Sequence, residues 1–84
     1  MTGGYLLKIQ GTKGWPDRLC ILSNGRHFFC EFKAPGEVPT SLQQYYLDQL
    51  QLRGHPAFAI DNYEAFIKAH NEHSRLPTAA VGPA

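Results

Sequence analysis

The stretch WPDRLCILSNGRHFFCEFK, residues 15–33, decides the fold of this chain. It reads as two strands joined by a turn at residues 23–25. Asp17 stands at the start of the first strand, and Glu31 and Lys33 stand at the end of the second. Side chains two residues apart on a strand share a face, so Glu31 and Lys33 are expected to point the same way.

The length of the turn decides whether Asp17 joins them. A two-residue type I′ loop at residues 24–25 would set Arg18 opposite Glu31 and leave Asp17 on the other face. A three-residue loop at residues 23–25, with its glycine in the left-handed region, would set Asp17 opposite Glu31. Two carboxylates about 5 Å apart repel each other and are expected where a cation lies between them. We therefore predict the three-residue loop.

Length and composition limit the possible functions. The chain has 84 residues, a net charge of +1 and two cysteines. We expect one small domain over residues 1–74 and a disordered tail over residues 75–84. An apolar run of membrane-spanning length and a secretory leader are both absent from the sequence, which favours a cytoplasmic protein without membrane contact. Its basic side chains are expected to gather around the proposed site as DNA contacts: Lys8, Lys13 and Arg18.

Cys20 and Cys30 could form a disulfide, bind a metal or pack in the core. In the predicted register they are diagonal neighbours on one face, buried among Leu22, Phe28 and Phe32. Neither belongs to a CxxC pair. Core packing is the preferred interpretation, because a free cysteine behaves as a small buried apolar side chain.

The flanking segments predict the rest of the sheet. Residues 5–9 suit an edge strand, and the glycine-punctuated residues 10–14 are either a connector or a loop that contacts phosphate through Lys13. Residues 57–61 suit a short buried strand. Both hairpin strands are apolar on both faces, which is typical of the centre of a covered sheet.

Two helices complete the predicted α/β fold. Thr40 and Gln43 form a capping box for a helix over residues 41–53, and Asp61 with Glu64 is expected to cap a second helix ending near Glu72. The order strand, helix, strand predicts a right-handed crossover with two parallel strands. The sheet is therefore small and mixed, with a central β-hairpin. The apolar stripe expected on the first helix is Leu42, Tyr45, Tyr46, Leu50 and Leu52.

The charged residues of the hairpin suit phosphodiester hydrolysis. Asp17, Glu31 and the backbone carbonyl of Phe32 could bind Mg²⁺ or Mn²⁺, which prefer oxygen ligands. Lys33 would orient the attacking water or stabilise the developing charge, and Gln43 could reach Lys33 or a phosphate. The alternative is that Glu31 and Lys33 form a solvated pair and that Gln43 is a capping residue alone. Spacing by itself does not separate the two.

The runs GWPDR (residues 14–18), FCEFKAPG (residues 29–36) and PTSLQ (residues 39–43) together resemble the VRR-NUC (virus-type replication-repair nuclease) family of the PD-(D/E)xK superfamily. The resemblance implies a restriction-endonuclease-like core and a Mg²⁺- or Mn²⁺-dependent DNA endonuclease active in DNA repair. It also implies the roles of four side chains. Asp17 and Glu31 are the metal ligands, Lys33 is catalytic, and Gln43 supports the site.

The same resemblance implies partners and exposes a departure. Small phage and bacterial members are homodimers that act on branched DNA such as Holliday junctions, which places the chain in a bacterial or phage-infected cell. The family pattern has a helix with a further acid before the first strand, whereas residues 1–13 contain no acid. We therefore expect this helix to be missing. The alternative function is a catalytically weak or inert module that binds DNA or a partner protein.

Overall fold

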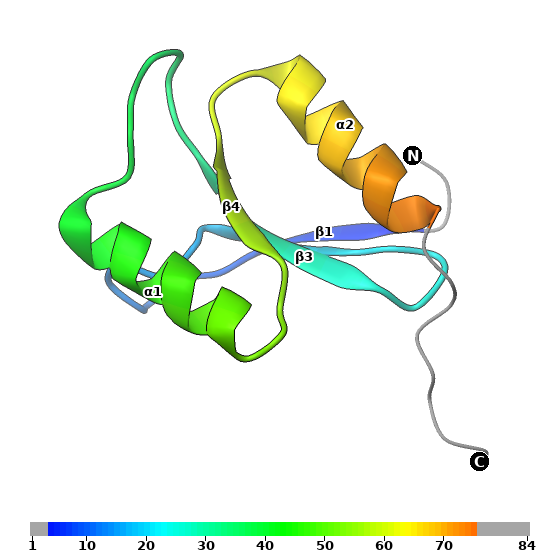
Figure 1. Cartoon of the computed structure of the whole chain (residues 1–84), viewed down its shortest axis with the longest axis horizontal. Helices are drawn as coiled ribbons and strands as arrows, with labels where there is room; N and C mark the ends of the chain where they lie inside the picture. The colour runs from blue at the N-terminus through cyan, green and yellow to red at the C-terminus, as the bar shows by residue number, and fades with distance from the viewer. Residues whose placement is uncertain (1–3, 76–84) are drawn as a thin grey trace.

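The computed structural model of the chain describes residues 4–75 and has two helices packed on a four-stranded sheet (Figure 1). The strands lie in the order β1-β2-β3-β4; β1, β2 and β3 are antiparallel, and β4 is parallel to β3. This is the mixed α/β fold with a central hairpin that the sequence predicts. The elements are β1 (Tyr5–Lys8), β2 (Arg18–Ile21), β3 (His27–Phe32), α1 (Ser41–Leu52), β4 (Ala57–Ile60) and α2 (Tyr63–Ser74).

The hairpin between β2 and β3 has the predicted three-residue loop. The Leu22 N–H donates to the Arg26 carbonyl at 2.8 Å, and Gly25 adopts a φ of +84°. This left-handed conformation has no steric penalty for a residue without Cβ. Asn24 Oδ1 accepts the Arg26 N–H at 3.0 Å and so closes the turn. The register that follows, from Ile21 opposite His27 to Arg18 opposite Cys30, confirms the sequence prediction.

Each face of the sheet is covered by one helix (Figure 1). The core under α2 contains Cys20, Leu22, Phe28, Cys30, Ile60 and Ala69, and the core under α1 contains Leu47, Leu50 and Ala57, against which Trp15 and Phe29 pack. Side chains alternate along a strand, so one hairpin supplies apolar groups to both cores.

The two cysteines are free and fully buried under α2, which confirms the core-packing interpretation. Burial raises the pKa of both thiols, that of Cys30 to about 12, so they remain protonated. Phe32, predicted to lie in the same core, is 36% exposed because it stands at the end of β3.

The apolar stripe predicted for α1 is only partly correct. Leu50 is buried as expected, and Leu47 is buried without having been predicted. Leu52 is 79% exposed and Leu42 is 41% exposed. The reason is that the surface of α1 that meets the sheet is narrow, so one i, i+3 pair fills it.

The cap of α2 is Asn62 and not Asp61. Asn62 Oδ1 accepts the Ala65 N–H at 2.7 Å. Asp61 Oδ2 instead accepts the Gly36 N–H at 3.1 Å and holds the connection that follows β3. That hydrogen bond is the first cause of the lowered pKa of Asp61. The helix extends two residues past its predicted end, and the predicted tail lies outside the described residues apart from Arg75.

Candidate active site

Asp17 and Glu31 face each other across the two central strands. Arg18, the first residue of β2, is paired with Cys30. The same register, continued by one residue, places Asp17 opposite Glu31. Since Leu22 and Arg26 exchange a backbone hydrogen bond, alternation makes Asp17 and Glu31 a non-hydrogen-bonded pair. Opposed Cα atoms are about 4.5 Å apart in such pairs, which brings the side chains closer than in the hydrogen-bonded pairs.

The position of Asp17 is held from two sides. Its carbonyl accepts the Ile9 N–H at 2.9 Å, which extends the pairing of β1 with β2. Its carboxylate Oδ1 accepts the Phe32 N–H at 3.2 Å. These contacts fix Asp17 at the position where it faces Glu31.

Glu31 is a buried carboxylate with one oxygen that lacks a partner. The residue is 6% exposed, and its Oε1 has no hydrogen-bond partner among the described residues. Burial and the neighbouring Asp17 charge raise the pKa of Glu31, and the Lys33 ammonium offsets this only in part. A buried acceptor without a partner is destabilising, so this oxygen is suited to a cation that the protein alone does not supply.

Lys33 lies on the same face as Glu31. Its Nζ is 4.0 Å from Glu31 Oε2, and its side chain is 16% exposed. The pair is therefore neither a short ion pair nor the solvated pair of the alternative interpretation. The ammonium is close enough to act on a group bound at the two carboxylates.

Gln43 connects α1 to Glu31. Its Oε1 accepts the Thr40 N–H at 2.9 Å, which completes the predicted capping box. Its Nε2 donates to Glu31 Oε2 at 3.4 Å. The amide of Gln43 therefore contacts the Glu31 carboxylate, a contact that the sequence did not predict. Gln43 caps the helix and positions Glu31 at the same time.

The carbonyl of Phe32 faces a residue that cannot donate to it. The Lys33 N–H donates to Ile60 on β4 at 2.9 Å, so by alternation the backbone groups of Phe32 face β2. The residue there is the buried Pro16, which has no N–H. Pro16, directly before Asp17, thus indicates in the sequence that the Phe32 carbonyl receives no backbone hydrogen bond from this position. The sequence prediction did not use this residue.

The glycine-rich loop packs on the first turn of α1. Gly14 has a φ of +83°, and a Cβ there would lie 2.5 Å from Leu42 Cγ, so only glycine allows this approach. Lys13 and Gln43 line one shallow hollow between the loop and the helix. The structure therefore brings Lys13 to the first turn of α1, next to Gln43.

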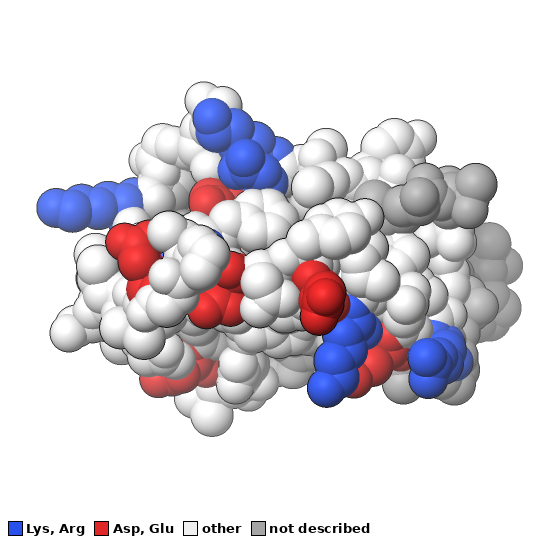
Figure 2. Space-filling view, turned by 90° about the horizontal axis from the view of Figure 1, so that it is seen from above, with Lys and Arg blue, Asp and Glu red and all other residues white. Residues whose placement is uncertain are grey.

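Lys8 and Arg18 lie on the other face of the sheet from the two carboxylates, although the Arg18 guanidinium donates to the backbone carbonyl of Asp17 at 3.0 Å. They are paired on β1 and β2, and the Arg18 guanidinium lies over the Phe32 ring at 5.7 Å. Because consecutive side chains alternate, Arg18 lies on the α2 face while Asp17 lies on the α1 face. In the view from above, the lysine and arginine side chains lie at several separate places with acidic side chains between them (Figure 2). This face therefore has no single basic patch among the described residues.

The donor set is small but fits a hard cation. Two carboxylates and one backbone carbonyl are oxygen ligands of the kind that Mg²⁺ and Mn²⁺ take, and Glu31 Oε1 is a buried oxygen without a hydrogen-bond partner in the described part of the chain. Within residues 4–75, the structure places no third acid, cysteine or histidine with these two. The third acid expected from the resemblance thus has no counterpart in that range.

The chain is similar to a phage protein named "Putative nuclease p44", from Acyrthosiphon pisum secondary endosymbiont phage 1. The two are 43% identical over 64 residues, which cover 74% of this chain and 69% of the phage protein. No family model and no solved structure matches the chain. None of the helices in the described part of the chain is long and apolar enough to span a membrane. At this identity and coverage, the chain belongs to the family of this phage nuclease.

Proposed function

We propose that the chain is a Mg²⁺- or Mn²⁺-dependent DNA endonuclease. The observation that carries this proposal is the buried Glu31 carboxylate, which has an oxygen without a partner and faces Asp17 across the sheet. A pair of like charges in a partly buried position is costly unless a cation joins it. The relationship to a phage nuclease supports the same chemistry.

Five residues have roles in this proposal. Asp17, Glu31 and the Phe32 carbonyl would hold the ion, which when bound lowers the pKa of a water and offsets charge on the phosphate. The Lys33 ammonium faces the same place and stabilises the negative charge that develops on the phosphate. Gln43 holds Glu31 through its amide.

Lys13 is the DNA contact that the geometry favours. It lines the hollow next to Gln43, at the first turn of α1, where backbone N–H groups also suit a phosphate. Lys8 and Arg18, on the other face at the same end of the sheet, would contact the strand beyond the site. Following the resemblance to VRR-NUC nucleases, we propose a homodimer with a restriction-endonuclease-like core that acts on branched DNA.

The test is divalent-dependent nicking of a branched and a linear DNA. Wild type is expected to nick in Mn²⁺ or Mg²⁺ and not in EDTA. Asp17→Asn and Lys33→Ala are expected to reduce the rate by about 100-fold or more, since each removes charge that acts at the reacting phosphate. Circular dichroism and thermal melting check that both variants are folded.

The matched controls are an exposed acid and an exposed lysine outside the site. Asp48→Asn on α1 and Lys68→Ala on α2 make the same chemical changes and should retain wild-type rates. Equal cleavage by Asp17→Asn, Lys33→Ala and their controls would overturn the assignment.

A second candidate function is favoured by the small donor set. With two acids in place of three, the chain could bind DNA or a partner protein without cutting. This candidate predicts DNA binding that weakens steeply with salt and no metal-dependent products at any Mn²⁺ concentration. The nicking assay therefore separates the two candidates directly.

A further inference from the structure

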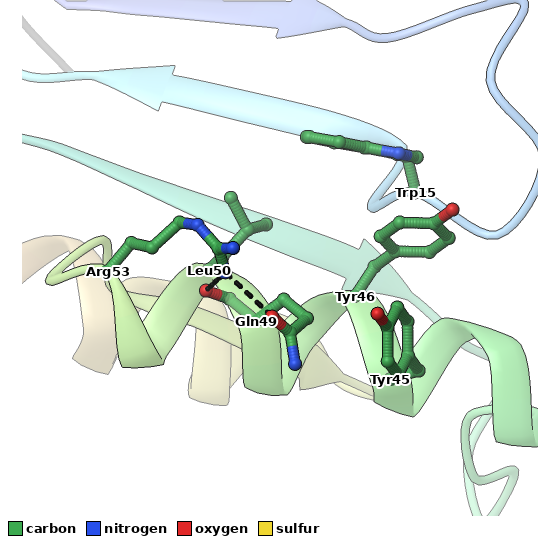
Figure 3. Close-up of a pocket in the computed structure, with 6 residues that line it drawn as sticks. All are labelled: Trp15, Tyr45, Tyr46, Gln49, Leu50 and Arg53. Carbon is green, nitrogen blue, oxygen red and sulfur yellow. Dashed lines mark hydrogen bonds between the residues drawn. The ribbon is translucent and has the colours of Figure 1, made fainter.

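We propose that a hollow beside the candidate active site binds an unpaired nucleobase of the DNA strand. This inference rests on the proposed nuclease function and adds a second contact to it. The hollow measures about 280 Å³ and opens along α1 (Figure 3). It is lined by Trp15, Tyr45, Tyr46, Gln49, Leu50 and Arg53.

One end of the hollow is aromatic. The Trp15 and Tyr46 rings lie 5.3 Å apart at 30°, and Tyr45 meets Tyr46 edge-on at 5.2 Å and 79° (Figure 3). Tyr45 is 54% exposed, and Trp15 and Tyr46 are partly exposed, so ring surface remains open to solvent. Proteins that hold single-stranded nucleic acid stack bases on such rings, because every base has a π-face.

The other end is cationic and polar. Arg53 Nη1 donates to the Gln49 carbonyl at 3.0 Å and to its Oε1 at 2.7 Å, which holds the guanidinium against the helix (Figure 3). Arginine has five N–H donors, more than these contacts use. A base stacked on the rings at the aromatic end could therefore accept hydrogen bonds from the Arg53 N–H groups at the other end. The acceptors on the base would be its ring nitrogens and carbonyl oxygens.

Two segments of chain link the lining of the hollow to the candidate active site. Trp15 precedes Asp17 by two residues, so their Cα atoms are at most about 7 Å apart. Tyr46 follows Gln43 by one helical turn on the same side of α1, a rise of about 4.5 Å. A nucleotide in the hollow would thus neighbour the phosphate held at Asp17 and Glu31.

The close packing of Gly14 keeps the hollow in shape. A Cβ at this position would lie 3.3 Å from Tyr46 Cδ2 and 2.5 Å from Leu42 Cγ. The loop therefore holds Trp15 against the aromatic side of α1, as part of the same approach that positions Asp17. We infer that base binding selects DNA with an unpaired nucleotide next to the scissile phosphate, since a paired base cannot enter.

Trp15 is the only tryptophan in the sequence, which makes its fluorescence a direct readout. Wild type is titrated in EDTA, where no cleavage is expected, with a single-stranded oligonucleotide and with an abasic strand that carries the same phosphates. We expect quenching of Trp15 emission by the base-containing strand and little quenching by the abasic one. Tyr45→Ala and Arg53→Ala should weaken binding of the base-containing strand about tenfold and leave duplex binding unchanged.

Tyr5→Ala is the matched control. Tyr5 is 67% exposed and pairs with Ile21, at the end of the sheet away from Asp17, so it should bind like wild type. Equal affinity and equal quenching for the two strands would overturn the base site. The base site would also be overturned if Tyr45→Ala changed the oligomeric state and left the DNA affinity unchanged, because the hollow would then be a protein interface.

The same assay separates this proposal from the proposed function. Binding and quenching are measured without divalent metal, whereas nicking is measured with it. A protein that binds the base-containing strand through Trp15 but never nicks would contradict the nuclease proposal alone. A protein that nicks but does not distinguish the abasic strand would contradict the base site alone.

Discussion

At the scale of single residues, the candidate site is a region of unfavourable electrostatics. Glu31 is buried, faces Asp17 and has its nearest cation at 4.0 Å. Burial and the Asp17 charge raise its pKa, and the Lys33 ammonium offsets this only in part, so the folded chain disfavours the ionised carboxylate. A fold that needed only stability would place an apolar or amide side chain here. The proposal of a metal site at Asp17 and Glu31 rests on this buried charge.

Glu31→Gln is accordingly expected to stabilise the metal-free protein at neutral pH. The raised pKa means that stability is greatest while Glu31 is protonated and falls as pH rises through its folded-state pKa. The amide removes this dependence, for a gain of about 1 kcal/mol, or about 4–8 °C in melting temperature. Thermal melts in EDTA at several pH values measure the change.

Metal should make wild type more stable than Glu31→Gln. Mn²⁺ binds the native wild type and is expected to raise its melting temperature, more at higher pH because the ligand must be deprotonated. Glu31→Gln should lose most of this rise. Glu64→Gln, an exposed acid at the start of α2, is the control and should behave as wild type. A less stable Glu31→Gln protein in EDTA would refute the account of this charge.

At the scale of elements, the hairpin turn decides which face each catalytic candidate occupies. One residue fewer between Leu22 and Arg26 would slip the register and move Asp17 away from Glu31. Gly25 and Asn24 specify the longer turn together, the first through its left-handed φ and the second through its hydrogen bond to the Arg26 N–H. Asn24 Nδ2 also donates to the His73 carbonyl at 3.0 Å, which ties the turn to the end of α2.

Gly25→Ala is expected to destabilise the protein by about 1–2 kcal/mol, because a Cβ is strained at this φ. Gly25→Asn is the matched variant, since asparagine tolerates the left-handed region, and should lose much less. Urea unfolding of the two variants measures the difference. Equal loss in both would mean that the turn, and with it the register, depends on something other than this φ.

The first turn of α1 joins helix stability to the site. The Gln43 amide satisfies the Thr40 N–H with its oxygen and the Glu31 carboxylate with its nitrogen. The capping requirement therefore fixes which end of the amide faces the site. Gln43 is therefore both part of the helix cap and a hydrogen-bond partner of Glu31.

At the scale of the whole molecule, a histidine pair joins the sheet to the connection after α1. His27 Nε2 and His55 Nδ1 are 3.0 Å apart, so one ring donates and the other accepts. His27 is partly buried in this position. Burial, then the proximity of His55 and His73, lowers the pKa of His27, so protonation opposes folding.

Stability is therefore expected to fall as pH drops below about 6.5, the unperturbed histidine pKa, toward the lower pKa of folded His27. The contribution is fully present above that value, where the ring is neutral in both states. His27→Gln should flatten the dependence, and His70→Gln on α2 should not. Urea unfolding at pH 7.5, 6 and 5 tests this, and parallel curves for wild type and His27→Gln would contradict it.

The sequence by itself determined the elements, the turn and the face of the hairpin that carries Asp17, Glu31 and Lys33. These depend on short-range physics: strand alternation, the conformational freedom of Gly25 and the capping box at Thr40 and Gln43. Local patterns also explain the failures of the prediction. Asp61 and Asn62 are equally good caps by type, and the hydrogen bond to Gly36 that occupies Asp61 comes from a distant loop.

Only the tertiary structure decided what surrounds the site. It showed that the Arg18 guanidinium lies over the Phe32 ring and donates to the Asp17 carbonyl, that Gln43 contacts Glu31, and that Trp15 meets Tyr46. The physical reason is that desolvation and side-chain contacts depend on segments far apart in the chain, packed by helices whose rotation local propensity does not set. The hairpin can be predicted from its own residues. The lack of a hydrogen-bond partner for Glu31 Oε1 within residues 4–75 becomes evident only when the neighbouring elements are in place.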